Sequence, residues 1–347
     1  MSSIIKIVIG VVILGIAAGG ISLGSKLWDP VWNPFRSSPE KIIEQMQTNM
    51  GAVKTFYSEG KIDIASREGA SEFTMSMTFD NNSDISDPQY PKSNANFDIT
   101  AAVEGMEFSI GMQTKVIGET YYLKLIKIPL PAQSLLSMFG TNINLIKNQW
   151  IKFDEETLKG LSGATPYMTQ ELSEKQEKAM IEKLQRIFIE RPIYYIKEEL
   201  PDEEIREKKA YHYLIALDKE EIKKIIPELL DIMIEFSLTP VVSVSEEEIS
   251  NKIDELFENV GELSTEIWIG KKDKLIYKIK GEKEIDLNRF KGEKKGIVTG
   301  KLDIEFSNFD QPVEIKAPEY FKSLEEIFGQ FQTPINNQFR MPINQIQ

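Results

Sequence analysis

Cysteine is missing from all 347 residues of the sequence, and histidine nearly so, with His212 as the only one. The lack of cysteine excludes disulfides, thiolate nucleophiles, zinc–cysteine sites and the lipid-modified cysteine that anchors many bacterial surface proteins. A single histidine excludes multi-histidine metal sites, and any Ser-His-Asp arrangement would have to use His212. With 41% hydrophobic and 27% charged residues, the chain still has ample material for a globular core.

Positive charge is also scarce relative to negative charge. The chain has 41 Lys and Arg against 54 Asp and Glu, which gives a formal charge of −13. Such an excess repels phosphate backbones, and the sequence shows no clustered Lys/Arg stripe interleaved with exposed aromatic residues. Gly-rich phosphate loops of the Walker or dinucleotide type are absent from the sequence too. We therefore expect neither a nucleic-acid partner nor a cofactor.

Few sequence patterns suggest catalysis, and each has a simpler interpretation. Gly160–Ala164 (GLSGA) resembles a nucleophile elbow but lacks the final glycine, so we interpret it as a loop. His212 lies in an alternating segment that places it opposite Tyr211 and Tyr213, as an ordinary strand histidine. Spacing cannot exclude a carboxylate pair for glycoside hydrolysis, because so many acidic residues guarantee accidental pairs. We expect the protein not to be an enzyme.

A metal site is not expected either. Asp80–Asp87 carries oxygen ligands at alternate positions, superficially like a calcium loop. The sixth position is Ile85 rather than glycine, and the twelfth is Pro91 rather than glutamate. We therefore interpret this stretch as a polar loop between strands.

The longest apolar run lies at residues 4–23 and contains a single charge, Lys6. At about 1.5 Å per residue its twenty residues give roughly the 30 Å of a bilayer core. The run predicts a transmembrane anchor within residues 1–25, followed by a proline-containing linker at 26–38. A cleaved signal peptide is the alternative, and both interpretations export the rest of the chain. The residues assigned to the anchor and its aromatic belt are Ile4, Ile7, Val8, Val11, Val12, Ile13, Leu14, Ile16, Trp28 and Trp32.

This anchor predicts a single-pass protein of the cell membrane whose C-terminal part is extracytoplasmic. Residues 39–330 form the predicted extracytoplasmic domain, although a division near residues 155–190 stays open because the domain is large. Residues 331–347, rich in Asn, Gln and Pro, are expected to be disordered.

Within the exported part, hydrophobic periodicity changes several times. Helical spacing predicts helices at 39–52, within 155–190, at 219–236 and 245–259, and near Tyr320–Phe328. Alternation with a period of two predicts a meander of strands from Thr55 to Phe153. Further strands are expected at 192–200 and 208–218, joined by the charged turn PDEEIREK, then a hairpin turning at Gly270–Asp273 and a long strand at 296–309.

These elements predict an α+β fold with one large curved, mostly antiparallel sheet of about eleven strands, a half-barrel with helices covering one face. The order of elements resembles the LolA-like fold and the LppX/LprAFG group of surface lipid-binding proteins. The segments that carry this resemblance are FYSEG (56–60), NQWIKF (148–153), YHYLIALD (211–218), IWIG (267–270) and FSNFDQPVEIKAP (306–318). It covers about residues 40–155 and 205–320, and the chain departs from the group in lacking its lipid-anchor cysteine. The resemblance implies a curved sheet that holds a hydrophobic ligand between sheet and helices.

The first predicted sheet is rich in methionine and phenylalanine, which suit a pliable cavity for an acyl chain because methionine adapts to irregular apolar shapes. An apolar strand face that simply packs as core is the competing interpretation. Our leading hypothesis is a non-catalytic carrier of a lipid or other hydrophobic ligand, and the alternative is an envelope scaffold with a solid core that binds a protein partner. The residues predicted to line the cavity are Phe73, Met75, Met77, Phe79, Phe97, Ile99, Phe108, Ile110 and Met112, with Met106 and Met138 as further members of the same methionine-rich set.

Overall fold

The computed structural model describes residues 38–323 and 326–327, apart from residues 70, 88–89, 139–142, 144–145, 154–175, 177–178, 181–182, 185–186, 188–192, 237–244 and 291–294. The predicted anchor, its linker, the GLSGA segment and the C-terminal tail lie outside these residues. Among the helices that are described, none is long and apolar enough to cross a membrane.

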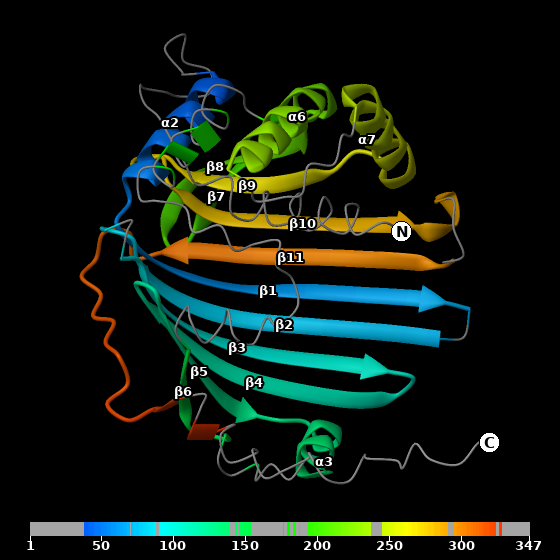
Figure 1. Cartoon of the computed structure of the whole chain (residues 1–347). Coiled ribbons are helices and arrows are strands. Elements are labelled where there is room, and N and C mark those ends of the chain that lie inside the picture. The colour runs from blue at the N-terminus through cyan, green and yellow to red at the C-terminus, as the bar shows by residue number, and fades with distance from the viewer. Residues whose placement is uncertain are drawn as a thin grey trace, which may run out of the picture.

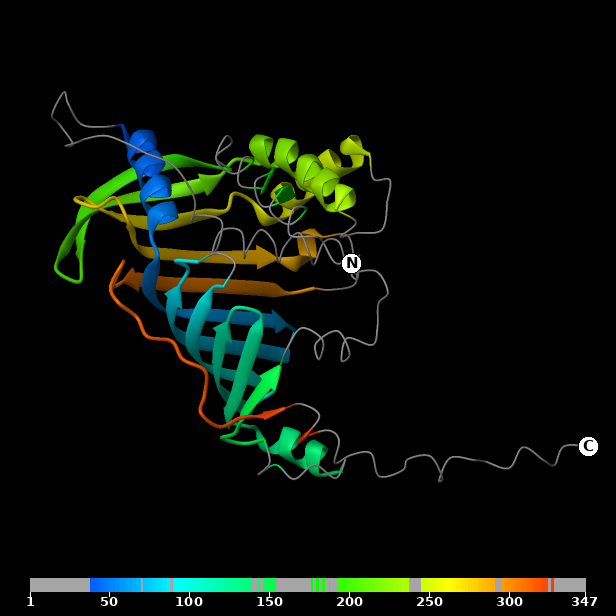
Figure 2. The same ribbon diagram turned by 60° about the vertical axis from the view of Figure 1, so that its left-hand side comes forward.

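Twelve strands form one curved sheet that does not close (Figures 1 and 2). Their order from edge to edge is β12-β6-β5-β4-β3-β2-β1-β11-β10-β9-β8-β7, and every pairing is antiparallel except that of β12 with β6. The strands are β1 Thr55–Glu68, β2 Ser71–Asp84, β3 Lys92–Val103, β4 Met106–Ile117, β5 Thr120–Lys127, β6 Trp150–Phe153, β7 Tyr194–Ile205, β8 Lys208–Leu217, β9 Ser264–Gly270, β10 Ile276–Asp286, β11 Ile297–Ser307 and β12 Lys322–Ser323.

The pairing of β1 with β11 joins the two halves of the sheet. It runs in continuous register from Tyr57 opposite Ser307 to Arg67 opposite Ile297. The N-terminal meander β1–β6 therefore lies on one side of this pair and β7–β10 on the other. Residues 154–193 connect β6, near one edge, with β7 at the opposite edge.

The helices begin at residues whose side chains satisfy free backbone N–H groups. Ser38 caps α2 (Pro39–Ala52), Asp218 caps α6 (Lys219–Glu235), and Ser245 caps α7 (Glu246–Val260). Glu246, Glu247 and Glu248 occupy the first turn of α7, where the helix dipole favours negative charge. A fourth helix, α3 (Leu130–Met138), follows β5, and a short 3₁₀ helix, η2 (Leu287–Arg289), follows β10.

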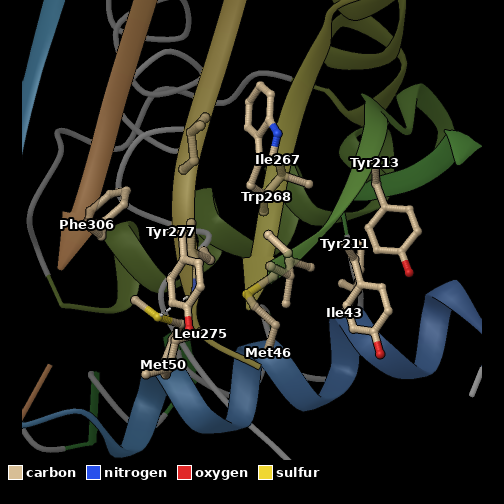
Figure 3. Close-up of a cluster of buried hydrophobic side chains, with 14 of the residues drawn as sticks. Ile43, Met46, Met50, Tyr211, Tyr213, Ile267, Trp268, Leu275, Tyr277 and Phe306 are labelled. Carbon is tan, nitrogen blue, oxygen red and sulfur yellow. Dashed lines mark hydrogen bonds between the residues drawn. The ribbon is translucent and has the colours of Figure 1, made fainter. Parts of the chain in front are cut away.

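The largest buried cluster lies between α2 and strands β8–β11. Ile42, Met46 and Met50 of α2 are at most 1% exposed and pack against the strands. Figure 3 shows Met46 and Met50 extending from the helix toward Ile267 and Tyr277. Because α2 immediately precedes β1, its position also fixes where the first strand enters the sheet.

The structure confirms much of the predicted order. The helix at 39–52, the meander from Thr55 to Phe153, the helices near 219–236 and 245–259, the hairpin at Gly270–Asp273 and the last long strand are all present. Within the predicted helical stretch 155–190, the described residues Gln176, Ala179, Met180, Lys183, Leu184 and Ile187 are helical. Met180, Leu184 and Ile187 pack against residues of α6.

Three expectations about local structure differ from what the structure shows, and one helix was missed. The sheet has twelve strands rather than about eleven, because Lys322–Ser323 pair with β6 where the sequence predicted the start of a helix. The turn between β7 and β8 is only Arg206–Glu207, both with positive φ (48° and 65°), so most of PDEEIREK is strand. Asp80–Asp84 is the end of β2 rather than a loop, held by pairing with both β1 and β3. Helix α3 was not predicted.

Candidate functional site

The nine residues predicted to line a cavity all project from one face of three adjacent strands. Opposite residues in an antiparallel pair point to the same side of the sheet, so the register defines rows across the strands. Sheet position thus brings together side chains that are far apart in sequence. The rows are Phe79, Phe97 and Met112; Met77, Ile99 and Ile110; Met75, Ala101 and Phe108; and Phe73, Val103 and Met106.

The same rows continue into the neighbouring strands. Ile62 and Ile64 of β1 lie opposite Met77 and Met75, and Leu125 of β5 lies opposite Met112. Leu302 of β11 extends the row of Ile62 toward the buried cluster under α2. Because helix α2 packs on this side of the sheet, we call it the α2 face. Ile62 and Ile64 were missed in the sequence, although their alternation with Lys61 and Asp63 signals them.

No charged side chain lies on the α2 face of β1–β5 within the described rows from Phe56 to Ser66 of β1 and their register partners. The opposite face of the same strands is polar and charged. It carries Lys61, Asp63, Asp80, Asp98, Lys115 and Lys124. This alternation is typical of a sheet with one face turned to an apolar environment.

Exposure differs sharply between the two halves of the α2 face. On β8–β10, Tyr213, Ile269 and Ile276 are 0% exposed, because α2 packs over them. On β2–β4, none of the nine predicted residues is buried, and Met106 at the far end is 60% exposed. The described helices α2, α6 and α7 pack around β7–β11. The apolar surface therefore continues beyond the part that these helices cover.

Phe79 marks the boundary between the two halves. Its ring lies over Gly60 of β1, 2.9 Å from the position that a Cβ atom would take there. The ring also packs against the buried cluster under α2 and lies 6.3 Å from the ring of Phe97. The glycine thus leaves room for an aromatic ring that links the covered core to the open surface.

A polar row borders this surface at the end nearest the start of β1. Ser58 is 5% exposed and Ser83 is 7% exposed, and Asn81 Nδ2 donates to Ser83 Oγ at 2.7 Å. Asn81 Oδ1 is buried and has no hydrogen-bond partner among the described residues. A buried amide oxygen of this kind can accept a hydrogen bond from water or from a ligand hydroxyl.

The opposite face of the sheet is stabilised by ion pairs near its centre. Arg206 pairs with Glu59 and with Glu305, and Lys278 Nζ lies 2.8 Å from Asp303 Oδ1 and 3.3 Å from Glu305. Partial burial opposes ionisation of Glu305, but hydrogen bonds from Arg206 and Lys278 outweigh it and lower the pKa of this carboxyl. A hollow of about 260 Å³ on this face is lined by residues that include Asp63, Thr74, Ser76, Thr100 and Lys301.

His212 also lies on the face opposite Tyr211 and Tyr213, as predicted. Its ring stacks on Trp268 with centroids 4.1 Å apart, and its Nε2 lies 2.8 Å from Glu266 Oε2. Trp268 Nε1 in turn donates to Glu203 at 2.9 Å. These contacts join β7, β8 and β9, which is a structural role. Within the described ranges, no three Asp, Glu or His side chains are grouped so as to hold a metal ion.

Two predicted members of the methionine-rich set have different outcomes. Met106 lies on the α2 face opposite Val103. Met138 ends α3, and its side chain is outside what the structure describes. Whether the nine residues bind a ligand stays a prediction, although the sheet places them side by side on a single face.

Comparison with known proteins gives structural likeness alone. Neither a protein-family model nor a curated protein matches the sequence. Among solved structures, lipoprotein LppX of Mycobacterium tuberculosis matches with 10% identity and a TM-score of 0.33, covering 81% of this chain and all (100%) of LppX. LprF of Mycobacterium bovis matches with 12% identity and a TM-score of 0.33, covering 81% of this chain and 98% of LprF.

A DUF1329 family protein of Desulfovibrio piger matches with 12% identity and a TM-score of 0.18, covering 76% of this chain and 88% of that protein. LppX and LprF belong to the group that the sequence resemblance named. With TM-scores of 0.33 and below, these matches carry no weight for ligand or activity.

Proposed function

We propose that this chain is a membrane-anchored, extracytoplasmic protein that binds or carries a lipid or other hydrophobic molecule on the α2 face of β1–β5. The observation that carries the proposal is the continuous, uncharged, partly exposed apolar surface there. Apolar surface left in water costs about 25 cal/mol per Å². A hydrophobic ligand that covers the surface recovers this free energy, since both apolar partners leave water together.

The side chains of this surface suit an extended hydrocarbon chain. Met75, Met77 and Met112 are unbranched and adapt to irregular apolar shapes. Phe79 and Phe97 give broad, flat contact area beside them. The rows run across three strands, so an acyl chain can lie along them without meeting a charged group. The proposed role is binding rather than catalysis, because the described residues of this surface offer apolar contact and no charged group.

Anchoring by residues 1–25 and export of residues 39–330 are part of the same proposal. The support is the twenty-residue apolar run, whose length matches a bilayer core. A full-length chain expressed in its host should resist extraction from membranes by alkaline carbonate. Protease added outside the membrane should digest the C-terminal domain. A chain recovered intact in the cytosol would contradict both statements.

One pair of substitutions tests the ligand site directly. Met77 lies on the α2 face, and its neighbour Thr78 is exposed on the opposite face. Met77→Glu places a carboxylate in the apolar surface. Thr78→Glu adds the same charge at the next residue, but on the opposite face of the sheet. Native mass spectrometry and lipid extraction of purified residues 37–332 should find a co-purifying hydrophobic ligand in the parent protein and in Thr78→Glu, and none in Met77→Glu.

The same variants separate the carrier from a scaffold with a solid core. In a carrier, Met77→Glu remains folded by circular dichroism, because the side chain is partly exposed. In a solid core, the buried carboxylate would unfold the protein. A parent protein that carries no ligand and has no affinity for apolar dyes or lipids would refute the proposal.

A further inference from the structure

A second surface, on the opposite face of the sheet, collects positive charge around an aromatic residue. Lys115 of β4 and Lys124 of β5 both lie close to Trp150 of β6, with their Nζ atoms 5.5 Å and 5.6 Å from the ring centroid. Both distances are within the range of cation–π attraction. With the residues that the structure describes, neither lysine forms an ion pair. Register places Lys152 on the same face, opposite Tyr122.

Exposed aromatic side chains lie beside these lysines. The extended segment before β12 crosses this side of the sheet, and Lys115 Nζ donates to the carbonyl of Lys316 at 2.9 Å. Phe321 packs edge-on against Tyr122 with centroids 5.6 Å apart, yet remains 46% exposed. Tyr320 is 85% exposed. We call Lys115, Lys124, Trp150, Tyr320 and Phe321 the basic edge.

The far side of the sheet has the opposite charge. Strand β7, the other edge, carries five carboxylates and one lysine within twelve residues. Figure 1 shows β6 at one end of the sheet and β7 at the other. The chain as a whole carries −13, so the basic edge is a local reversal of its charge. An anionic surface would therefore attract one edge of the sheet and repel the other. The five carboxylates are Glu198, Glu199, Asp202, Glu203 and Glu204.

We propose that the basic edge docks on an anionic membrane surface and so orients the sheet relative to the bilayer. The two lysines and Trp150 lie together on one face of the sheet, where positive charge and an aromatic ring can both reach a plane of headgroups. Trp and Tyr side chains prefer the membrane–water interface, where the ring is apolar and the polar atom stays wet. Each lysine near an anionic leaflet strengthens attachment by about fivefold.

This docking rests on the proposed function, because an anchored chain has the bilayer within reach. The basic edge includes residues of β4, β5 and β6. Strands β4 and β5 also contribute side chains to the outer end of the apolar α2 face. Docking therefore brings strands β4 and β5, which carry part of the proposed ligand surface on their other face, close to the membrane, the source of hydrophobic molecules.

The test uses the full chain in lipid vesicles and exploits the absence of native cysteine. A donor dye is attached at Ala317→Cys, exposed beside the basic edge, or at Pro201→Cys, exposed on β7. Neither substitution changes the charge. Energy transfer to an acceptor on lipid headgroups then reports how near each edge lies to the bilayer. In vesicles that contain phosphatidylglycerol, transfer should be greater from position 317 than from position 201.

Charge reversal provides the matched comparison. Lys115→Glu with Lys124→Glu should remove the difference between the two dye positions, as should molar salt, which shortens electrostatic range to about 3 Å. Lys272→Glu with Lys280→Glu makes the same charge change at two exposed lysines elsewhere and should leave the difference intact. Equal transfer from both positions in the parent chain, or the same loss in both double variants, would overturn the proposal.

Flotation separates the docking from the anchor. A chain that floats with purely phosphatidylcholine vesicles but shows equal transfer from both positions when phosphatidylglycerol is included refutes docking and supports the anchor. A chain that floats only when phosphatidylglycerol is included refutes the anchor and supports docking.

Discussion

The two halves of the α2 face should respond very differently to the same truncation. Ile269 of β9 and Ile99 of β3 lie on this face, but Ile269 is 0% exposed and Ile99 is partly exposed. Replacing isoleucine by alanine removes three carbons, each contributing about 0.8 kcal/mol when fully buried. Beneath α2 the variant Ile269→Ala also leaves an enclosed cavity. We therefore expect a total loss of about 3 to 4 kcal/mol of unfolding free energy.

Ile99→Ala should cost far less in protein freed of ligand. The side chain is already partly in water, so less transfer free energy is lost and no closed cavity forms. What remains is mainly strand propensity, about 1 kcal/mol. Urea denaturation of residues 37–332, followed by the fluorescence of Trp150 and Trp268, measures both variants on the same transition. Equal losses for Ile99→Ala and Ile269→Ala would show that the β2–β4 surface is closed core, which would refute the reasoning.

Three further substitutions test how the fold is held together. Gly270→Ala should destabilise the protein by about 2 kcal/mol or more in urea denaturation, because the new Cβ would overlap Asp273 and the ring of Tyr277. The control Gly300→Ala places its Cβ in open space and should cost about 1 kcal/mol or less. Asp218→Ala removes the side chain that accepts from the Glu220 and Glu221 amides at 2.9 Å and 3.1 Å, so we expect a loss of about 1 kcal/mol of unfolding free energy. The control Asp231→Ala, within the same helix, should be nearly neutral. Glu305 has a pKa below its ordinary 4.5 in the folded state, so its stabilising effect is complete above pH 4.5 and is lost as pH falls through the lowered pKa. The Tm of Glu305→Gln should therefore decline less on acidification than the Tm of the parent protein. An unchanged dependence of Tm on pH would contradict this.

Local periodicity was sufficient to predict the elements of the meander. Alternation in Phe73–Phe79 and Phe97–Val103 identified strands and also the face that each side chain occupies. Capping residues such as Ser38 and Ser245 mark helix starts, because they satisfy free N–H groups within a few residues. Strands and helix starts that depend on residues close together in the chain could therefore be predicted from the sequence.

Long-range pairing was beyond the reach of periodicity. Nothing in β1 or β11 alone specifies that Tyr57 lies opposite Ser307, about 250 residues away, although this pair unites the sheet. Lys322–Ser323 are a strand only because β6 offers an edge to pair with, so tertiary context replaced the start of the helix expected near Tyr320–Phe328, while the described residues Glu326 and Ile327 are helical.

The basic edge was invisible for the same reason. Lys115, Lys124 and Trp150 are spread over 36 residues and meet only when β4, β5 and β6 pair. The sequence shows no basic stripe, and the surface exists only in the folded sheet. By contrast, the apolar α2 face was predictable as a set of residues, but its exposure depends on which strands α2 covers.

Photo-crosslinking tests the central claim most directly. A fatty acyl probe with a diazirine on its chain is bound to residues 37–332, irradiated, and the labelled peptides are identified by mass spectrometry. We predict labelling concentrated on β2–β4, at Met75, Met77, Phe97, Ile99 and Met112, and reduced by Met77→Glu but not by Thr78→Glu. Labelling spread over the opposite face, or confined to α6 and α7, would contradict a ligand surface on the α2 face.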